Sequence, residues 1–263
     1  MNNRVRLTTD SRGVATVTLS RPHTHNAFDD CMVDELTSAF ETTMTNPSAR
    51  VMILAAEGKI FSAGADLAWM KRMGEYSYKE NLKDAKNLAK MLKTLKEMPL
   101  PTIARVQGAA FGGALGLISC CDIAIAAMKA SFAFSEVKIG LIPATISPYI
   151  IEAMGSCAAR YYFMTGEKFD APQAVELGLI NDAVEETLLD NTIAQLITTL
   201  LENSPTAMHS AKQLVKDIRN RPVNDELIKE TCERIADIRR SAEGQEGLSA
   251  FLEKRKPHWR QDN

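Results

Sequence analysis

Two stretches of the chain repeat one pattern: Val51-Met-Ile-Leu-Ala55 followed by Phe61-Ser-Ala-Gly-Ala-Asp-Leu67, and Thr102-Ile-Ala-Arg-Val106 followed by Gly108-Ala-Ala-Phe-Gly-Gly-Ala-Leu-Gly-Leu117. In each, an apolar strand-like run leads through a glycine-bearing turn into an apolar helix-like run. Such a turn leaves backbone N–H groups unpaired at the start of a helix, where the helix dipole favours negative charge. Two facing turns of this kind can hold one oxygen atom as it becomes an anion. The pattern therefore points to chemistry on a carbonyl compound.

Around these turns, strands alternate with helices, which predicts an α/β fold with a largely parallel sheet. We expect strands at 4–7, 14–19, 51–55, 102–106 and 123–126, and helices at 30–44, 78–97 and 112–119. After about residue 186 the strand pattern ends, and helices are expected at 186–203, 206–219, 224–241 and 243–255. The chain thus divides into a core, residues 1–190, and a helical region, residues 191–263. Amphipathic helices of this kind are expected to pack on the core or on another subunit.

The composition narrows the class of protein. The 263 residues include 31 basic and 33 acidic side chains, a net charge of −2, which gives no general attraction to nucleic acid or to an anionic membrane. The sequence has no apolar run long enough to span a bilayer and no secretory or transit pattern at its start. Its five cysteines and four histidines show no metal-ligand spacing. We expect a cytoplasmic protein with no metal, no nucleic-acid partner and no membrane association.

One carboxylate is a candidate for acid–base chemistry. The segment 131–140 alternates in polarity, which predicts an extended strand with Phe132, Phe134, Glu136 and Lys138 on one side. A carboxylate beside two phenylalanines is partly desolvated, and desolvation raises its pKa toward the range useful for proton transfer. The alternative is a solvated Glu136 paired with Lys138, and the pattern leaves both interpretations open.

The glycines of the second turn also have two interpretations. Gly112 and Gly113 allow a tight backbone and close approach of a ligand, because a side chain would obstruct both. Gly116 lies within the helix-like run, where glycine is unfavourable and marks either close helix packing or ligand approach.

Taken together, the two turn motifs, Cys121-Asp-Ile123 and Ser135-Glu-Val-Lys-Ile-Gly-Leu-Ile-Pro143 resemble the enoyl-CoA hydratase/isomerase (crotonase) family in order and spacing. The resemblance extends over nearly the whole chain. It implies a spiral of ββα units with a C-terminal helical trimerisation region, assembled as a homotrimer or hexamer. It also implies an acyl-CoA thioester substrate and no cofactor, since CoA enters as part of the substrate.

The resemblance assigns roles by motif position. The two backbone donors that hold the enolate fall at Ala65 and Gly113, and the acid–base residue falls at Glu136. The resemblance also implies a set of substrate-binding residues: Ala63, Asp66, Gly112, Gly116, Lys71, Phe251 and Lys254. The carbonyl of Ala63 would meet the CoA adenine, and Phe251 and Lys254 would reach the CoA of a neighbouring subunit. From its place in the turn, Asp66 is also expected to cap or orient the helix that follows.

One position departs from the family pattern. Hydratases of the family usually carry two glutamates, and the first falls where this chain has Gly116. Our hypothesis is that Gly116 vacates space for a branched or carboxylated acyl chain, as in a subgroup of 3-methylglutaconyl-CoA and isohexenylglutaconyl-CoA hydratases that the motifs resemble. We therefore expect hydration of a branched or glutaconyl-type enoyl-CoA. The alternatives are a Δ3,Δ2-enoyl-CoA isomerase that uses the single glutamate, and a relative that binds acyl-CoA or RNA without turnover.

Overall fold

A six-stranded sheet lies at the centre of the computed structural model, which describes residues 4–260. The strand order is β1-β2-β3-β4-β6-β9, and the strands span Val5–Thr9, Val14–Leu19, Val51–Ala56, Thr102–Val106, Ile123–Ala127 and Asp182–Val184. The first two form an antiparallel hairpin, and every other neighbouring pair is parallel. The expected strands and the largely parallel sheet are confirmed.

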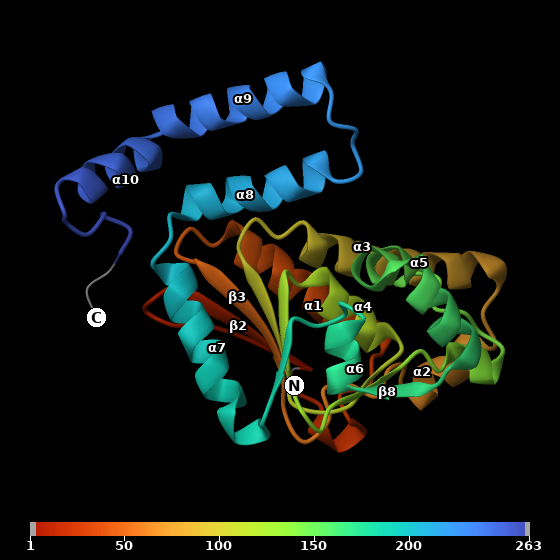
Figure 1. Cartoon of the computed structure of the whole chain (residues 1–263). Coiled ribbons are helices and arrows are strands. Elements are labelled where there is room, and N and C mark those ends of the chain that lie inside the picture. The colour runs from red at the N-terminus through yellow and green to blue at the C-terminus, as the bar shows by residue number, and fades with distance from the viewer. Residues whose placement is uncertain (1–3, 261–263) are drawn as a thin grey trace.

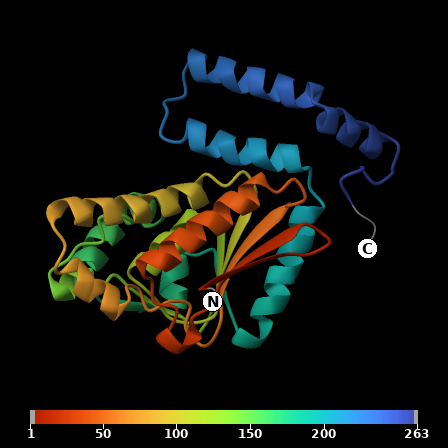
Figure 2. The same ribbon diagram turned by 180° about the vertical axis from the view of Figure 1, so that it is seen from behind.

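Helices cover both faces of this sheet, as Figures 1 and 2 show from opposite sides. Helices α1 (Asp30–Thr45), α3 (Tyr78–Lys96) and α4 (Gly113–Cys120) enclose the larger apolar core on one face. Helix α7 (Glu186–Leu201) packs on the other face, where Leu189 and Ile193 join a second apolar cluster with strand residues such as Ile53. Because the central strands are buried on both faces, they are continuous apolar runs rather than alternating ones.

A smaller sheet and three further helices complete the core. The sheet has the order β5-β7-β8, with strands Ala110–Phe111, Ser131–Ala133 and Lys168–Asp170. The remaining helices are α2 (Leu67–Met73), α5 (Ser147–Thr165) and α6 (Ala171–Glu176). Strand β5 lies within the second glycine turn, before Gly112, and pairs with β7, so this small sheet connects that turn to the segment that carries Glu136.

The last three helices form an arm beside the core: α8 (Pro205–Ile218), α9 (Asp225–Arg240) and α10 (Ala242–Leu252) (Figure 1). They confirm the C-terminal helices expected from periodicity, and the expected boundary at residue 190 falls inside α7. Helix α8 rests on the core, where Lys212 Nζ binds Asp122 at 2.7 Å and the Leu100 carbonyl at 3.1 Å. Helix α9 lies on the far side of α8 from the sheet in both views. No helix within residues 4–260 is long and apolar enough to cross a bilayer.

The expectation of one extended strand over 131–140 is wrong beyond its first residues. Strand β7 ends at Ala133, and Glu136 lies in the 3-10 helix η2 (Glu136–Ile139). The partner strand β8 pairs with only three residues of β7, so no ladder supports an extended chain further on. Ser135 adopts a helical conformation instead, and Glu136 leaves the side on which Phe132 and Phe134 are buried.

Candidate active site

The two glycine turns lie side by side. The Phe111 N–H donates to the Ser62 carbonyl at 3.0 Å, and the Phe61 N–H donates to the Ala109 carbonyl at 3.0 Å. Gly64 has a φ of +90°, and a Cβ there would lie 3.1 Å from the Phe111 carbonyl oxygen. Only glycine fits this position comfortably, because a side chain would strain the backbone and crowd the neighbouring turn.

One amide from each turn has no acceptor. Phe28 pairs with the first turn through two hydrogen bonds of 2.7 Å: its N–H donates to the Gly64 carbonyl, and its carbonyl accepts from the Asp66 N–H. The amide of Ala65, which lies between Gly64 and Asp66, takes no part in this pairing. Gly113 is the first residue of α4, where an amide has no partner within its helix. Neither amide donates to another residue of the described chain. Both residues line one cavity of about 600 Å³.

Glu136 lines the same cavity. Its Oε2 is buried and has no hydrogen-bond partner within residues 4–260, and burial raises the pKa of this carboxyl. A Cβ at Gly112, where φ is +55°, would lie only 3.2 Å from Glu136 Oε1, so this glycine makes room for the carboxylate. No ion pair joins Glu136 to Lys138 among the described residues, which leaves the desolvated carboxylate as the interpretation that the geometry supports.

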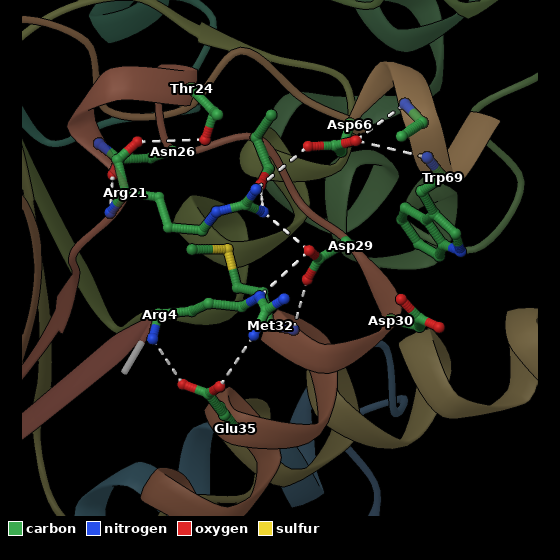
Figure 3. A network of polar contacts seen from close by, with 12 residues as sticks. Arg4, Arg21, Thr24, Asn26, Asp29, Asp30, Met32, Glu35, Asp66 and Trp69 are labelled. Atoms are coloured by element: carbon green, nitrogen blue, oxygen red, sulfur yellow. Dashed lines mark hydrogen bonds and ion pairs between the residues drawn. The ribbon is translucent and has the colours of Figure 1, made fainter. Parts of the chain in front are cut away.

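A polar network supports the turn that carries Ala65. Figure 3 shows the Arg21 guanidinium between Asp29 and Asp66, at 2.8 and 3.3 Å. Asp66 accepts from the Ala68 and Trp69 amides at the start of α2, which confirms its expected capping role. Asp29 caps α1 in the same way through the Met32 amide at 2.8 Å. Arg21 thereby connects the starts of two helices that flank the bridge between Phe28 and Ala65.

Comparison with known proteins agrees with this geometry. The family model described as enoyl-CoA hydratase/isomerase matches residues 9–262. The chain belongs to the enoyl-CoA hydratase/isomerase family. The structure of an enoyl-CoA hydratase from Shewanella pealeana is 48% identical, with a TM-score of 0.94 over 98% of this chain and 96% of that one. A Legionella pneumophila structure assigned to the enoyl-CoA hydratase/isomerase (crotonase) class is 42% identical, with a TM-score of 0.95 over 98% of this chain and 100% of that one.

Among curated relatives, the 2,3-dehydroadipyl-CoA hydratase of Escherichia coli is 29% identical over 94% of this chain and 95% of its own length. Together with the solved structures, this similarity over almost the full length confirms the crotonase-type α/β fold expected from the motifs.

Within this family member, the space beside Gly116 is filled. A Cβ on Gly116 would lie 2.4 Å from Ile146 Cγ2 and 3.3 Å from Leu92 Cδ2. Gly116 is buried and is not among the residues that line the cavity. The hypothesis that this glycine vacates space for the acyl chain is therefore wrong, because Ile146, thirty positions later in the chain, occupies that space. Close packing explains the glycine.

The other residues implied by the family resemblance lie outside the cavity lining. Ala63 is exposed in the first turn, and its N–H donates to the His25 carbonyl. The Ala63 carbonyl accepts no hydrogen bond from the described residues. Lys71 is exposed in the last turn of α2. Phe251, at 82% exposure, lies near the end of α10, and Lys254 follows that helix with a φ of +55°.

Sequence reasoning missed the wall of the cavity opposite the turns. This wall comes from α2, α3 and residues 140–146, and it includes Trp69, Asp84 and Leu88. Asp84 precedes Leu88 by four residues, so it lies on the face of α3 that also carries the buried Leu92 and Leu95. A carboxylate where the helical pattern calls for an apolar residue is the signal that would have found it.

One group of side chains has metal-ligating atoms close together. The ligand atoms of Asp29, Asp30 and Cys31 lie within 4.8 Å of one another. Asp29 already binds Arg4 and Arg21, and Asp30 binds Arg72 at 2.7 Å. Their charges are thus used in ion pairs that support α1 and α2.

Proposed function

We propose that this protein hydrates an α,β-unsaturated acyl-CoA thioester whose acyl chain is branched or of the glutaconyl type. The observation that supports this most strongly is one cavity lined by two amides without described acceptors and by Glu136, whose Oε2 is buried without a partner in the described chain. The cavity is bordered largely by apolar side chains, as an acyl chain requires.

The thioester oxygen would lie between the Ala65 and Gly113 amides. Negative charge gathers on this oxygen when water attacks the β-carbon, and each amide then donates a stronger hydrogen bond than in the ground state. A donor of this kind is worth about 3 kcal/mol of barrier height. The start of α4 adds the favourable field of its helix dipole at the Gly113 amide.

Glu136 would move both protons. Its carboxylate accepts a proton from the attacking water, and the carboxylic acid then donates a proton to the α-carbon, which returns the carboxylate to its starting state. The raised pKa suits this exchange because it makes the Glu136 carboxylate a stronger base toward the attacking water than a solvated glutamate. No other residue is needed to balance the addition of water.

We further propose a homotrimer or hexamer in the cytoplasm, with CoA bound as part of the substrate and no cofactor. Apolar side chains that would favour association are exposed on the arm, notably Val215, Ile228, Ile235, Leu248 and Phe251. In such an assembly Phe251 and Lys254 would reach the CoA of a neighbouring subunit, and Ala63 and Lys71 would contact the CoA of their own.

Product mass distinguishes the proposed reaction from its alternatives. Hydration adds the mass of one water to a 2-enoyl-CoA, whereas an isomerase converts a 3-enoyl-CoA to the 2-enoyl isomer with no change in mass. Glu136→Gln should lower kcat/KM for hydration roughly 10²–10⁴-fold. Glu75→Gln, which removes an exposed carboxylate outside the cavity, should leave it intact. Undiminished hydration by the Glu136 variant would refute the proposed role, and acyl-CoA binding without turnover of either substrate would refute the proposed activity.

A further inference from the structure

The acyl portion of the cavity has an unusual charge distribution. Of the residues that line it within 4–260, only Glu136 and Asp84 are ionisable acids, and no lysine, arginine or histidine lines it. Glu136 lies against the second turn, with its Oε1 3.2 Å from the Cβ position of Gly112, whereas Asp84 lies on α3, which also contributes Ala85 and Leu88 to the lining. A second negative group on the substrate would therefore meet like charge and no counter-ion from this chain.

Asp84 is held in place by the cavity wall itself. The indole N–H of Trp69 donates to Asp84 Oδ1 at 3.3 Å, and Trp69 is buried. No ion pair involving Asp84 forms within the described chain, and Arg72, the nearby cation on α2, is bound to Asp30 at 2.7 Å. The carboxylate thus keeps a fixed position with one oxygen engaged by a neutral donor.

The surrounding groups act on Asp84 in opposite directions. Burial raises the pKa of this carboxyl most, and the neighbouring carboxylates Asp30 and Asp34 raise it further. The Trp69 hydrogen bond and the Arg72 guanidinium lower the pKa, but burial prevails, and the pKa of Asp84 lies above its ordinary value.

We propose that Asp84 is a specificity-determining residue that excludes acyl chains ending in a carboxylate and admits uncharged ones. This inference rests on the proposed function and narrows it, because it selects the branched chain over the glutaconyl-type chain. A carboxylate beside Asp84 would be desolvated next to a like charge, and such repulsion is an effective way to reject a competing ligand.

The test uses two substrates that differ only by a carboxylate: 3-methylcrotonyl-CoA and 3-methylglutaconyl-CoA. Wild-type protein should show the higher kcat/KM with 3-methylcrotonyl-CoA. Asp84→Asn keeps an oxygen that accepts from Trp69 but removes the charge. It should raise kcat/KM for 3-methylglutaconyl-CoA roughly tenfold, equivalent to about 1.4 kcal/mol, and change the value for the uncharged substrate by less than about threefold.

Two controls keep the inference separate from the proposed function. Glu75→Gln removes one negative charge outside the cavity and should leave the ratio between the two substrates unchanged. Calorimetric binding of the saturated pair, isovaleryl-CoA and 3-methylglutaryl-CoA, measures the same discrimination without turnover. A shift in relative affinity with Asp84→Asn would support the charge filter even if neither unsaturated substrate is hydrated.

Two results would overturn the inference. One is a wild-type protein that accepts the carboxylated chain as well as the uncharged one. The other is an Asp84→Asn variant, folded by circular dichroism, in which both the kcat/KM ratio and the binding ratio equal those of the wild type.

Discussion

Replacing Gly116 by alanine tests the close packing between α4 and the chain around Ile146. The new Cβ would lie 2.4 Å from Ile146 Cγ2 and 3.0 Å from Ile146 Cβ, so Ile146 has to move. Ile146 is 2% exposed and closely packed, and it also borders the cavity, so its displacement disturbs its neighbours and the cavity wall.

Two opposing effects set the magnitude. Alanine is favoured over glycine inside a helix by about 1 kcal/mol. Overpacking a buried site typically costs about 1–3 kcal/mol. Since the clash is with a branched side chain close to its Cβ, we expect overpacking to prevail and Gly116→Ala to lower the free energy of unfolding by up to about 2 kcal/mol.

A double-mutant cycle isolates the contact. Ile146→Ala alone should cost about 2–4 kcal/mol, because it leaves a cavity. In the double variant the added methyl group occupies part of the vacated space, so the total loss should be smaller than the sum by about 1–2 kcal/mol. Urea unfolding at one fixed protein concentration measures all four proteins, since subunit association would otherwise contribute to the apparent stability.

Gly74→Ala provides the matched control. Gly74 has helical φ and ψ, and its added Cβ would make only an ordinary contact, 3.4 Å from the Lys71 carbonyl oxygen. This variant should be neutral or slightly stabilised. Additive free energies in the cycle, or a stabilised Gly116→Ala protein, would refute the packing explanation. A glutamate at position 116 meets the same obstruction, so Gly116→Glu alone should fail to create a second acid–base group.

Three further outcomes are expected. Glu136→Gln should lower kcat/KM by roughly 10²–10⁴-fold and remove the acidic limb of the pH profile, which in the wild type lies above the ordinary value of 4.5 because burial raises the pKa; an unchanged limb would contradict the assignment. The variant should also gain stability at pH 7 and lose that gain below pH 4.5, where the wild-type carboxyl is neutral in both the folded and the unfolded protein. Arg21→Gln should lower the free energy of unfolding by roughly 3 kcal/mol, because Asp29 and Asp66 lose a shared partner. As a control, Arg12→Gln removes an exposed ion pair and should cost under about 0.5 kcal/mol; equal effects of the two variants in urea unfolding would count against the network. Phe251→Ala should change unfolding by less than about 0.5 kcal/mol but weaken self-association in sedimentation velocity, and an unchanged association constant would remove Phe251 from the interface.

Much of the fold was predictable because its signals are local. Apolar runs such as 51–55 and 102–106 are buried on both sides, and the C-terminal helices have clear amphipathic spacing. Helix α5 is harder to recognise, since Gly155 interrupts it with a φ of +76°. Glu136 was assigned to a strand because alternation continues in the sequence after the pairing strand has ended.

The candidate site was predictable only where the main chain defines it. The glycine turns predicted unpaired amides at the starts of two helices, and the family motifs assigned them to Ala65 and Gly113 and the acid–base role to Glu136. The surroundings of Gly116 depend on Ile146, a contact between distant residues that no local pattern encodes. Asp84 was missed although the sequence does carry a signal for it, an acidic residue on the helix face that otherwise bears Leu88, Leu92 and Leu95; only the cavity shows what that residue borders.

The two cavity-lining amides have a consequence for divergence within the family. A backbone donor survives almost any replacement of its own side chain, provided that the turn keeps its conformation. Substitutions that leave Gly64 and the backbone pairing of the turns in place therefore keep both donors, whichever residues of α2, α3 and 140–146 line the rest of the cavity.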